Sequence, residues 1–252
     1  MGSGSSSHPS HELQKAEADI VKLMFPLYYC PQDITKEEHD IASETWMAIL
    51  NETSKDFLDK KKNDKNFTYS SCVTYFYDSF YMRLFDIHPM SKNLFKNGMR
   101  SQGKFLVKMI TLALSEINDS KKFDKTLVKL AEVHNERGVK AVEYGVVGEV
   151  LFYVMKKIIG PNNYGSKIHM AWVKVYSRML RIIVPTAVAL ELETGSSFQL
   201  KRLSMADSVM FETSKSADAS GADGEHAEPL EKLQSEKVRL AEATLGSAKQ
   251  NR

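Results

Sequence analysis

The feature that most constrains this chain is an apolar helical face that ends in a histidine, within residues 126–139. Four residues follow the spacing i, i+3, i+4 and i+7 of one α-helical face: Leu127, Leu130, Ala131 and His134. Gly138 is then expected to end the helix. The imidazole is either a core histidine with a hydrogen-bond partner or a ligand to a buried group. A zinc site would need further ligands at a set spacing, and His134 has none nearby.

Helical periodicity recurs along the chain, and no segment shows the alternation of a β-strand. Besides the histidine helix, helices are predicted over residues 13–29, 35–51, 70–87, 99–117, 142–159 and 165–192. Thr35 and Glu38 have the spacing of a capping box, and Pro185 predicts a kink or a local register change. The sequence therefore predicts an all-α fold.

Other segments are predicted to lie outside the helical body. Residues 55–65 form a charged run, typical of a solvated loop, and residues 1–12 and 196–252 have the composition of disordered chain. We therefore expect a partly disordered N-terminal extension over 1–34, whose short helix can dock on the body. A helical domain over 35–195 and a mostly disordered tail follow.

Composition excludes several classes of function. The net charge of +2 gives no reason to expect nucleic acid as a partner. No apolar run is long enough for a transmembrane helix, the start does not resemble a secretory signal, and there are only two cysteines, so we expect a cytoplasmic protein. Gly2 matches the pattern for myristoylation, although a small-residue leader matches it equally. One acyl chain would give only marginal membrane association.

Seven or eight helices, a buried imidazole and dense aromatic residues between 75 and 85 suggest a haem protein. From residue 35 to about 192 the chain resembles the globin family. The motifs that carry the resemblance follow the family's order: Pro89 with Phe95, Gln102 and Gly103 with Leu106, Leu130 with His134, Tyr144 with Leu151, and Trp172.

The resemblance is greatest to flavohaemoglobin-type haem domains and their single-domain relatives. Tyr81 with Gln102 and Leu106 resembles their distal pocket, and Tyr144 matches a tyrosine behind the proximal ligand. The carboxylate that the family places on its last helix falls at about Ala189, with Glu191 and Glu193 nearby. Roughly 20 extra residues precede the aromatic helix. About 60 residues follow the matched part, so any reductase is expected to be a separate protein.

This resemblance implies a three-over-three helical sandwich around haem b, with His134 as the iron ligand. It implies that Tyr81 and Gln102 donate hydrogen bonds to bound dioxygen. Tyr81 as a core residue only, and Gln102 facing solvent or gating the pocket, remain alternatives. His88 and His169 are more typical of surface or cap residues than of a second ligand. The implied cofactor-binding residues are Phe95, Leu106, Leu130, Val133, Arg137, Tyr144 and Val147.

Three functions are compatible with these features. The first is a globin that binds dioxygen and other diatomic gases such as NO and CO, and that converts nitric oxide to nitrate with an external reductase. The second is a haem-based sensor that signals through its two terminal extensions. The third, a haem-free interaction module with a globin fold, is disfavoured because His134, Phe95 and the polar distal pair are all present.

Overall fold

The computed structural model describes residues 11–95 and 98–212 of the 252-residue chain. Within these ranges all regular structure is helical. The elements in order are α1 (His11–Met24), α2 (Lys36–Leu50), α3 (Lys55–Asn63), α4 (Cys72–Ile87), the 3-10 helix η1 (Pro89–Leu94), α5 (Met99–Glu116), α6 (Ser120–Glu136), α7 (Glu143–Ile159) and α8 (Ser166–Glu212). The predicted all-α fold is confirmed.

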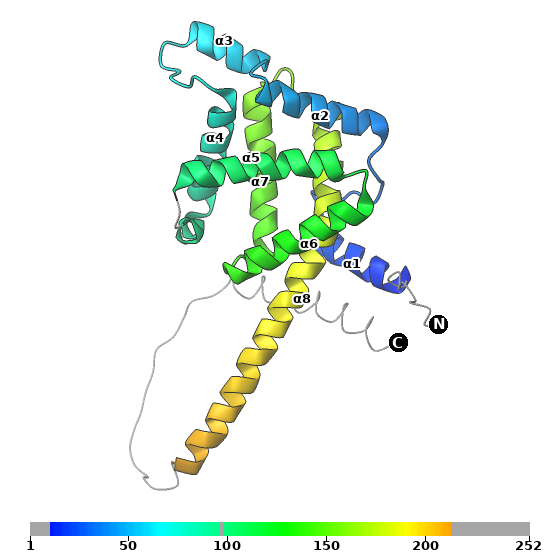
Figure 1. The fold of residues 1–252 in the computed structure, drawn as a ribbon, viewed down its shortest axis with the longest axis vertical. Helices are drawn as coiled ribbons and strands as arrows, with labels where there is room; N and C mark the ends of the chain where they lie inside the picture. Colours follow the sequence, from blue (N-terminus) through cyan, green and yellow to red (C-terminus); the bar gives the residue numbers. More distant parts are fainter. Residues whose placement is uncertain (1–10, 96–97, 213–252) are drawn as a thin grey trace, which may run out of the picture.

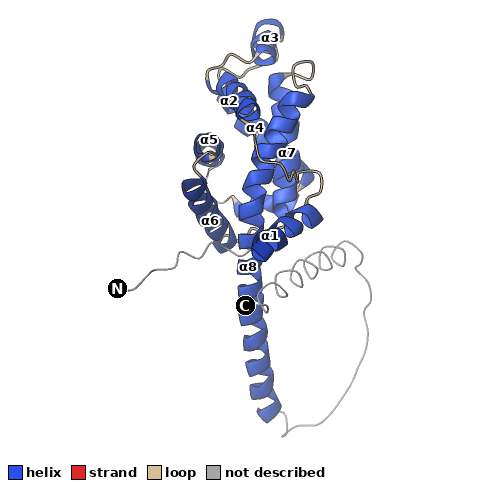
Figure 2. Ribbon diagram, turned by 90° about the vertical axis from the view of Figure 1, so that its right-hand side faces the viewer, coloured by secondary structure: helices blue, strands red, loops and turns tan. Residues whose placement is uncertain are grey.

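Six of the helices described form two layers of three. In one layer α5 is adjacent to both α2 and α6, and in the other α7 is adjacent to both α4 and α8. Figure 2 shows α5 and α6 on one side of the body and α4 and α7 on the other. In Figure 1, α5 runs across α4 and α7. This is the expected three-over-three sandwich, and it leaves space for a buried group between α5, α6 and the helices behind them.

The start of α2 and the end of α6 are set by the residues predicted to set them, Thr35 with Glu38 and Gly138, and a second glycine ends α7. The Thr35 hydroxyl accepts a hydrogen bond from the Glu38 N–H at 3.3 Å, and the Glu38 carboxylate accepts one from the Thr35 N–H at 2.9 Å, which confirms the capping box. Gly138 and Gly160, which follow α6 and α7, have φ of 85° and 93°. Glycine adopts this left-handed conformation without a steric penalty, so both helices end there.

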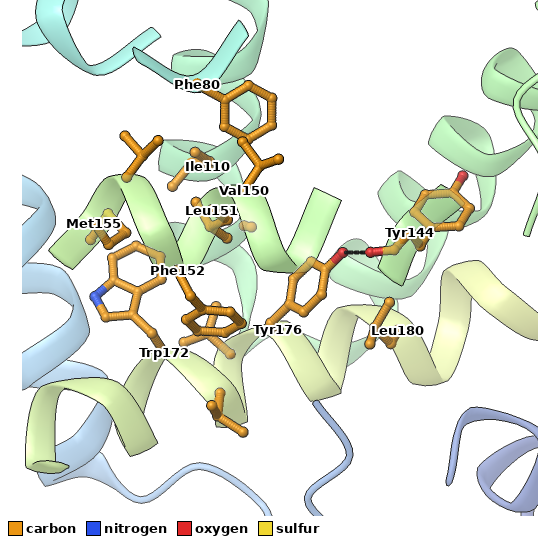
Figure 3. Packing of buried hydrophobic residues seen from close by; sticks show 14 of the residues in the cluster. Phe80, Ile110, Tyr144, Val150, Leu151, Phe152, Met155, Trp172, Tyr176 and Leu180 are labelled. Carbon is orange, nitrogen blue, oxygen red and sulfur yellow. Dashed lines mark hydrogen bonds between the residues drawn. The ribbon is translucent and has the colours of Figure 1, made fainter. Parts of the chain in front are cut away.

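The core is built around two tryptophans that lie on facing helices. Trp46 of α2 and Trp172 of α8 are buried, and their ring centroids are 6.2 Å apart in an edge-to-face arrangement. Each indole N–H is satisfied: Trp46 donates to Thr111 Oγ1 at 2.9 Å, and Trp172 donates to Thr45 Oγ1 at 2.9 Å. Figure 3 shows Trp172 among buried residues of α7 and α8. Aromatic burial with satisfied polar atoms stabilises the pairing of α2 with α8.

The prediction of a loop over residues 55–65 is wrong, because Lys55–Asn63 forms α3. Phe57 is fully buried and packs edge-to-face on Phe67, with ring centroids 5.6 Å apart. Asp56 pairs with Lys60 one turn on, and the Lys61 Nζ lies 5.6 Å from the centroid of the Phe57 ring. Burial of Phe57 therefore helps to stabilise a helix that is otherwise highly charged.

The N-terminal extension carries a helix that packs on the body, as the sequence allows. Ile20 and Val21 of α1 are almost completely buried, and α1 lies against α8. The last helix differs from the prediction, because α8 continues past residue 192 to Glu212. Gly195 costs a helix only about 1 kcal/mol relative to alanine, and no proline follows Pro185 within α8. The helix also continues through Pro185 itself.

Parts of the predicted tails, including Gly2 and residues 213–252, lie outside the described residues. Of the helices described, none is both long enough and apolar enough to cross a lipid bilayer.

Candidate functional site

A cavity of about 510 Å³ lies between α4, α5, α6, α7 and α8. Its volume is in the range of about 300–1,000 Å³ that is usual for sites of small molecules and cofactors. The ten residues that the resemblance assigned to the iron, the gas ligand or the cofactor all line it: Tyr81, Phe95, Gln102, Leu106, Leu130, Val133, His134, Arg137, Tyr144 and Val147. The fold therefore brings together residues that are up to 66 positions apart in the sequence.

His134 is held on α6 by a bond to one of its two ring nitrogens. A hydrogen bond of 3.1 Å joins its Nδ1 to the Tyr144 Oη. Among the described residues Nε2 has no hydrogen-bond partner, and the side chain lines the cavity. Burial, and to a lesser degree the charge of Arg137, lowers the pKa of His134. A neutral imidazole that donates from Nδ1 to the tyrosine keeps a lone pair on Nε2, as a metal ligand requires.

Tyr144 is itself fixed from behind. It is buried at the start of α7, and its carbonyl oxygen accepts a hydrogen bond from the Tyr176 hydroxyl. Burial, followed by the charges of Glu191 and Glu143, raises the pKa of Tyr144, so its phenol stays protonated. The sequence placed the family's carboxylate at about Ala189. In the structure the Glu191 carboxylate accepts a hydrogen bond from the Ala141 N–H, and no bond to Tyr144 is present among the described residues.

Tyr81 and Gln102 line the same cavity from α4 and α5. Tyr81 is buried against Phe95, with ring centroids 5.2 Å apart, and against Phe85 at 6.0 Å. Burial raises the pKa of Tyr81 to about 12, so its O–H remains a hydrogen-bond donor. Among the described residues the Tyr81 hydroxyl has no hydrogen-bond partner. Gln102 lines the cavity and is half-buried.

The rim of the cavity is polar on one side and apolar on the other. Arg137 is exposed, and His88 lies 3.8 Å from the Glu143 carboxylate, measured from Nε2 to Oε1. Phe105 of α5 lines the cavity although 59% of its surface is exposed. His88 caps α4, which agrees with the cap interpretation, whereas His169 lies outside the lining and packs on Phe152.

Several lining residues were missed by reasoning from the sequence. Tyr176 and Met179 were expected only as apolar members of the last helix. They follow Trp172 at i+4 and i+7, so its helical face was a usable signal. Phe105 follows Gln102 at i+3 and had the same signal. Its exposure could not be foreseen, because it depends on how α5 lies on the other helices.

The donor set and the lining fit a haem. One imidazole offers a free lone pair into a cavity whose other lining residues are mostly apolar. A large, mainly apolar cofactor with a single strong axial ligand from the protein needs this combination.

Comparison with known proteins gives a consistent result. Residues 78–183 match the globin family model. The chain is similar to a flavohemoprotein of Rhizobium meliloti (27% identity over 107 residues, covering 41% of this chain and 26% of the relative). It is also similar to an uncharacterized globin-like protein of Aquifex aeolicus (26% over 104 residues, covering 41% and 73%) and to neuroglobin of Danio rerio (27% over 111 residues, covering 38% and 69%). The chain thus spans about a quarter of the length of the flavohemoproteins it matches.

Proposed function

We infer, from the globin domain that this chain carries over residues 78–183, that the protein holds haem b in the cavity with His134 Nε2 as the axial ligand. The observation that carries this proposal is the orientation of His134. Its Nδ1 is hydrogen-bonded to Tyr144, and its Nε2, which has no partner among residues 11–95 and 98–212, lies beside an apolar space. His134 would hold the iron of a bound haem, and that iron would supply the site at which a diatomic gas binds.

The distal residues favour dioxygen among the possible gases. A dioxygen ligand is partly negative, and a protonated phenol and an amide N–H stabilise such a charge more in a buried site than in water. Tyr81 is buried, its hydroxyl has no partner in the part of the chain that the structure describes, and Gln102 lines the same cavity. We propose that both donate hydrogen bonds to the ligand, which gives tight binding and slow release.

Slow release of dioxygen suits oxygen chemistry better than transport. We propose a nitric oxide dioxygenase-like activity in which nitric oxide and dioxygen yield nitrate. The reaction consumes one electron per nitrate formed, and an external reductase would supply it. The presence of Tyr81 and Gln102 in one cavity, as in the distal pocket that the sequence resembles, motivates this reaction class. The segment that matches the flavohemoproteins is a quarter of their length. Carbon monoxide is expected to compete for the same position.

Replacing Tyr81 by phenylalanine tests the distal assignment. Each lost hydrogen bond to the ligand is worth about 1–3 kcal/mol, so dioxygen release should become about tenfold faster or more. The protein must first show a Soret band, which reports bound haem. Stopped-flow measurement on the haem-loaded protein then gives the rate of dioxygen release. Tyr75→Phe is the matched control, because Tyr75 is also a buried tyrosine of α4 but lies outside the cavity lining. An unchanged rate in Tyr81→Phe would show that this phenol makes no bond to the ligand.

A gas sensor is the second candidate, favoured by the shape of α8. This helix lines the cavity at Tyr176 and continues as far as Glu212, projecting from the body (Figure 1). We propose that a change at the haem reaches a partner through this helix. Truncation at about residue 200 should then change partner binding differently in the gas-bound and gas-free protein. Equal effects in both states, measured by affinity capture and titration, would favour the enzyme.

A further inference from the structure

Residues 25–30, here called the N-terminal brace, connect α1 to the helical body at the start of α7. The Phe25 ring lies against Gly145, where an added Cβ would be 2.8 Å from a ring carbon. The Tyr28 ring lies against Gly148, where an added Cβ would be 2.9 Å away. Both aromatic rings therefore contact the backbone of α7 at a distance that only glycine permits.

The brace also holds α7 and α8 together. Tyr28 stacks on Phe152 of α7, with ring centroids 5.4 Å apart and an interplanar angle of 16°. It meets Tyr176 of α8 edge-on at 5.8 Å and 83°. The Cys30 N–H donates to Ser177 Oγ at 2.8 Å, and the same hydroxyl donates to the Cys30 carbonyl at 3.1 Å. These hydrogen bonds are buried, so they are costly to break.

A short series of contacts leads from the brace to His134. The Tyr176 ring contacts Tyr28, and the Tyr176 hydroxyl donates a hydrogen bond to the Tyr144 carbonyl oxygen (Figure 3). The Tyr144 phenol is in turn 3.1 Å from His134 Nδ1. Two tyrosines thus separate Tyr28 from the proposed ligand. Both line the cavity, and Tyr28 does not.

We propose that Tyr28 is a positioning residue for the axial histidine. By fixing Tyr176 and the first turns of α7, it holds the Tyr144 phenol at hydrogen-bond distance from His134 Nδ1. The partner of the second ring nitrogen orients a ligating histidine and sets its basicity, so the brace tunes the bond from histidine to iron. This inference rests on the proposed function, since it concerns the haem ligand.

The test uses the full chain loaded with haem. Tyr28→Ala should speed haemin dissociation up to about tenfold, the lower end of the effect of outer-shell partners. It should also lower the iron–histidine stretching frequency in resonance Raman spectra of the ferrous protein and make the midpoint potential more positive. Both shifts follow from a less basic imidazole. Tyr28→Phe should restore wild-type values, because the contacts described are made by the ring. Leu27→Ala, at a neighbouring side chain that is 81% exposed, is the surface control.

A double-mutant cycle separates positioning from general destabilisation. Tyr144→Phe should shift the iron–histidine stretching frequency and the midpoint potential in the same directions as Tyr28→Ala. Adding Tyr28→Ala to Tyr144→Phe should change them little further, because the residue through which Tyr28 acts is already altered. Additive shifts, or a Tyr28→Ala protein with an unchanged stretching frequency and potential, would overturn the proposal.

Ser177→Ala provides a second route if Tyr28→Ala does not fold. It removes both hydrogen bonds to the Cys30 backbone and leaves every ring in place. A smaller shift in the same direction supports the proposal, and no shift in a folded, haem-loaded protein contradicts it. A wild-type protein that shows no Soret band after addition of haemin would instead refute the proposed function itself, so the two failures are distinguishable.

Discussion

His134→Ala is expected to abolish stable haem binding. Loss of an outer-shell partner of a metal ligand typically costs about 10–100-fold in affinity, so loss of the ligand itself should cost more than about 100-fold. The effect is large because the described residues offer no obvious replacement ligand. His88 is the other histidine in the described lining, and it lies at the rim near the Glu143 carboxylate. Titration of the purified protein with haemin, followed at the Soret band, measures the affinity.

The control for this variant is His169→Ala. His169 is an exposed histidine of α8 outside the cavity lining, so its removal should leave the spectrum and the affinity unchanged. Imidazole in solution should restore the wild-type spectrum to His134→Gly, because the small ligand can occupy the space of the missing side chain. A His134→Ala protein that still holds its pigment with an unaltered spectrum would show that the axial ligand is another residue.

Trp46→Ala should lower the free energy of unfolding by about 3–5 kcal/mol, the usual cost of truncating a buried tryptophan. Trp46 is buried between Phe76, at a centroid distance of 5.1 Å, and Trp172, and its N–H is bonded to Thr111. A domain is typically stable by about 5–15 kcal/mol, so this variant is expected near the limit of folding. Urea denaturation of the haem-free protein gives the value, since bound cofactor would add its own stabilisation.

Two further variants show how much of the loss in unfolding free energy comes from the Trp46 ring and its hydrogen bond. Trp46→Phe keeps an aromatic ring against Phe76 and loses the bond to Thr111, so it should cost distinctly less than the alanine variant. Met47→Ala changes a neighbouring side chain that is 46% exposed and should stay within about 0.5 kcal/mol of wild type. Equal losses in Trp46→Ala and Met47→Ala would mean that α2 does not pack on α8 as described.

Features that depend on local sequence were predictable. The histidine helix, the capping box at Thr35 and the ends at Gly138 and Gly160 follow from helical spacing and from the conformational range of glycine. The ten candidate site residues came from spacing and resemblance together, and the fold places all of them around one cavity. Their chemical roles remain predictions.

Features that depend on distant contacts were not predictable. α3 was expected as a loop, because nothing in a charged run shows that Phe57 will be buried against Phe67 and Tyr75. The brace joins Cys30 to Ser177, which are 147 positions apart, and no periodicity reports such a pair. The end of α8 was placed too early because the residues after Gly195 have the composition of disordered chain, and composition does not show that the helix continues to Glu212.

The length of α8 has a mechanical consequence. From Tyr176 to Glu212 the helix rises about 54 Å, at about 1.5 Å per residue, and its far end projects from the body (Figure 1). Treated as a rod pivoting at Tyr176, a tilt of about 5° moves that end by about 5 Å. Displacements at the cavity that are too small to rearrange the core are thereby amplified at the tip, where a distance probe attached near residue 212 would register them.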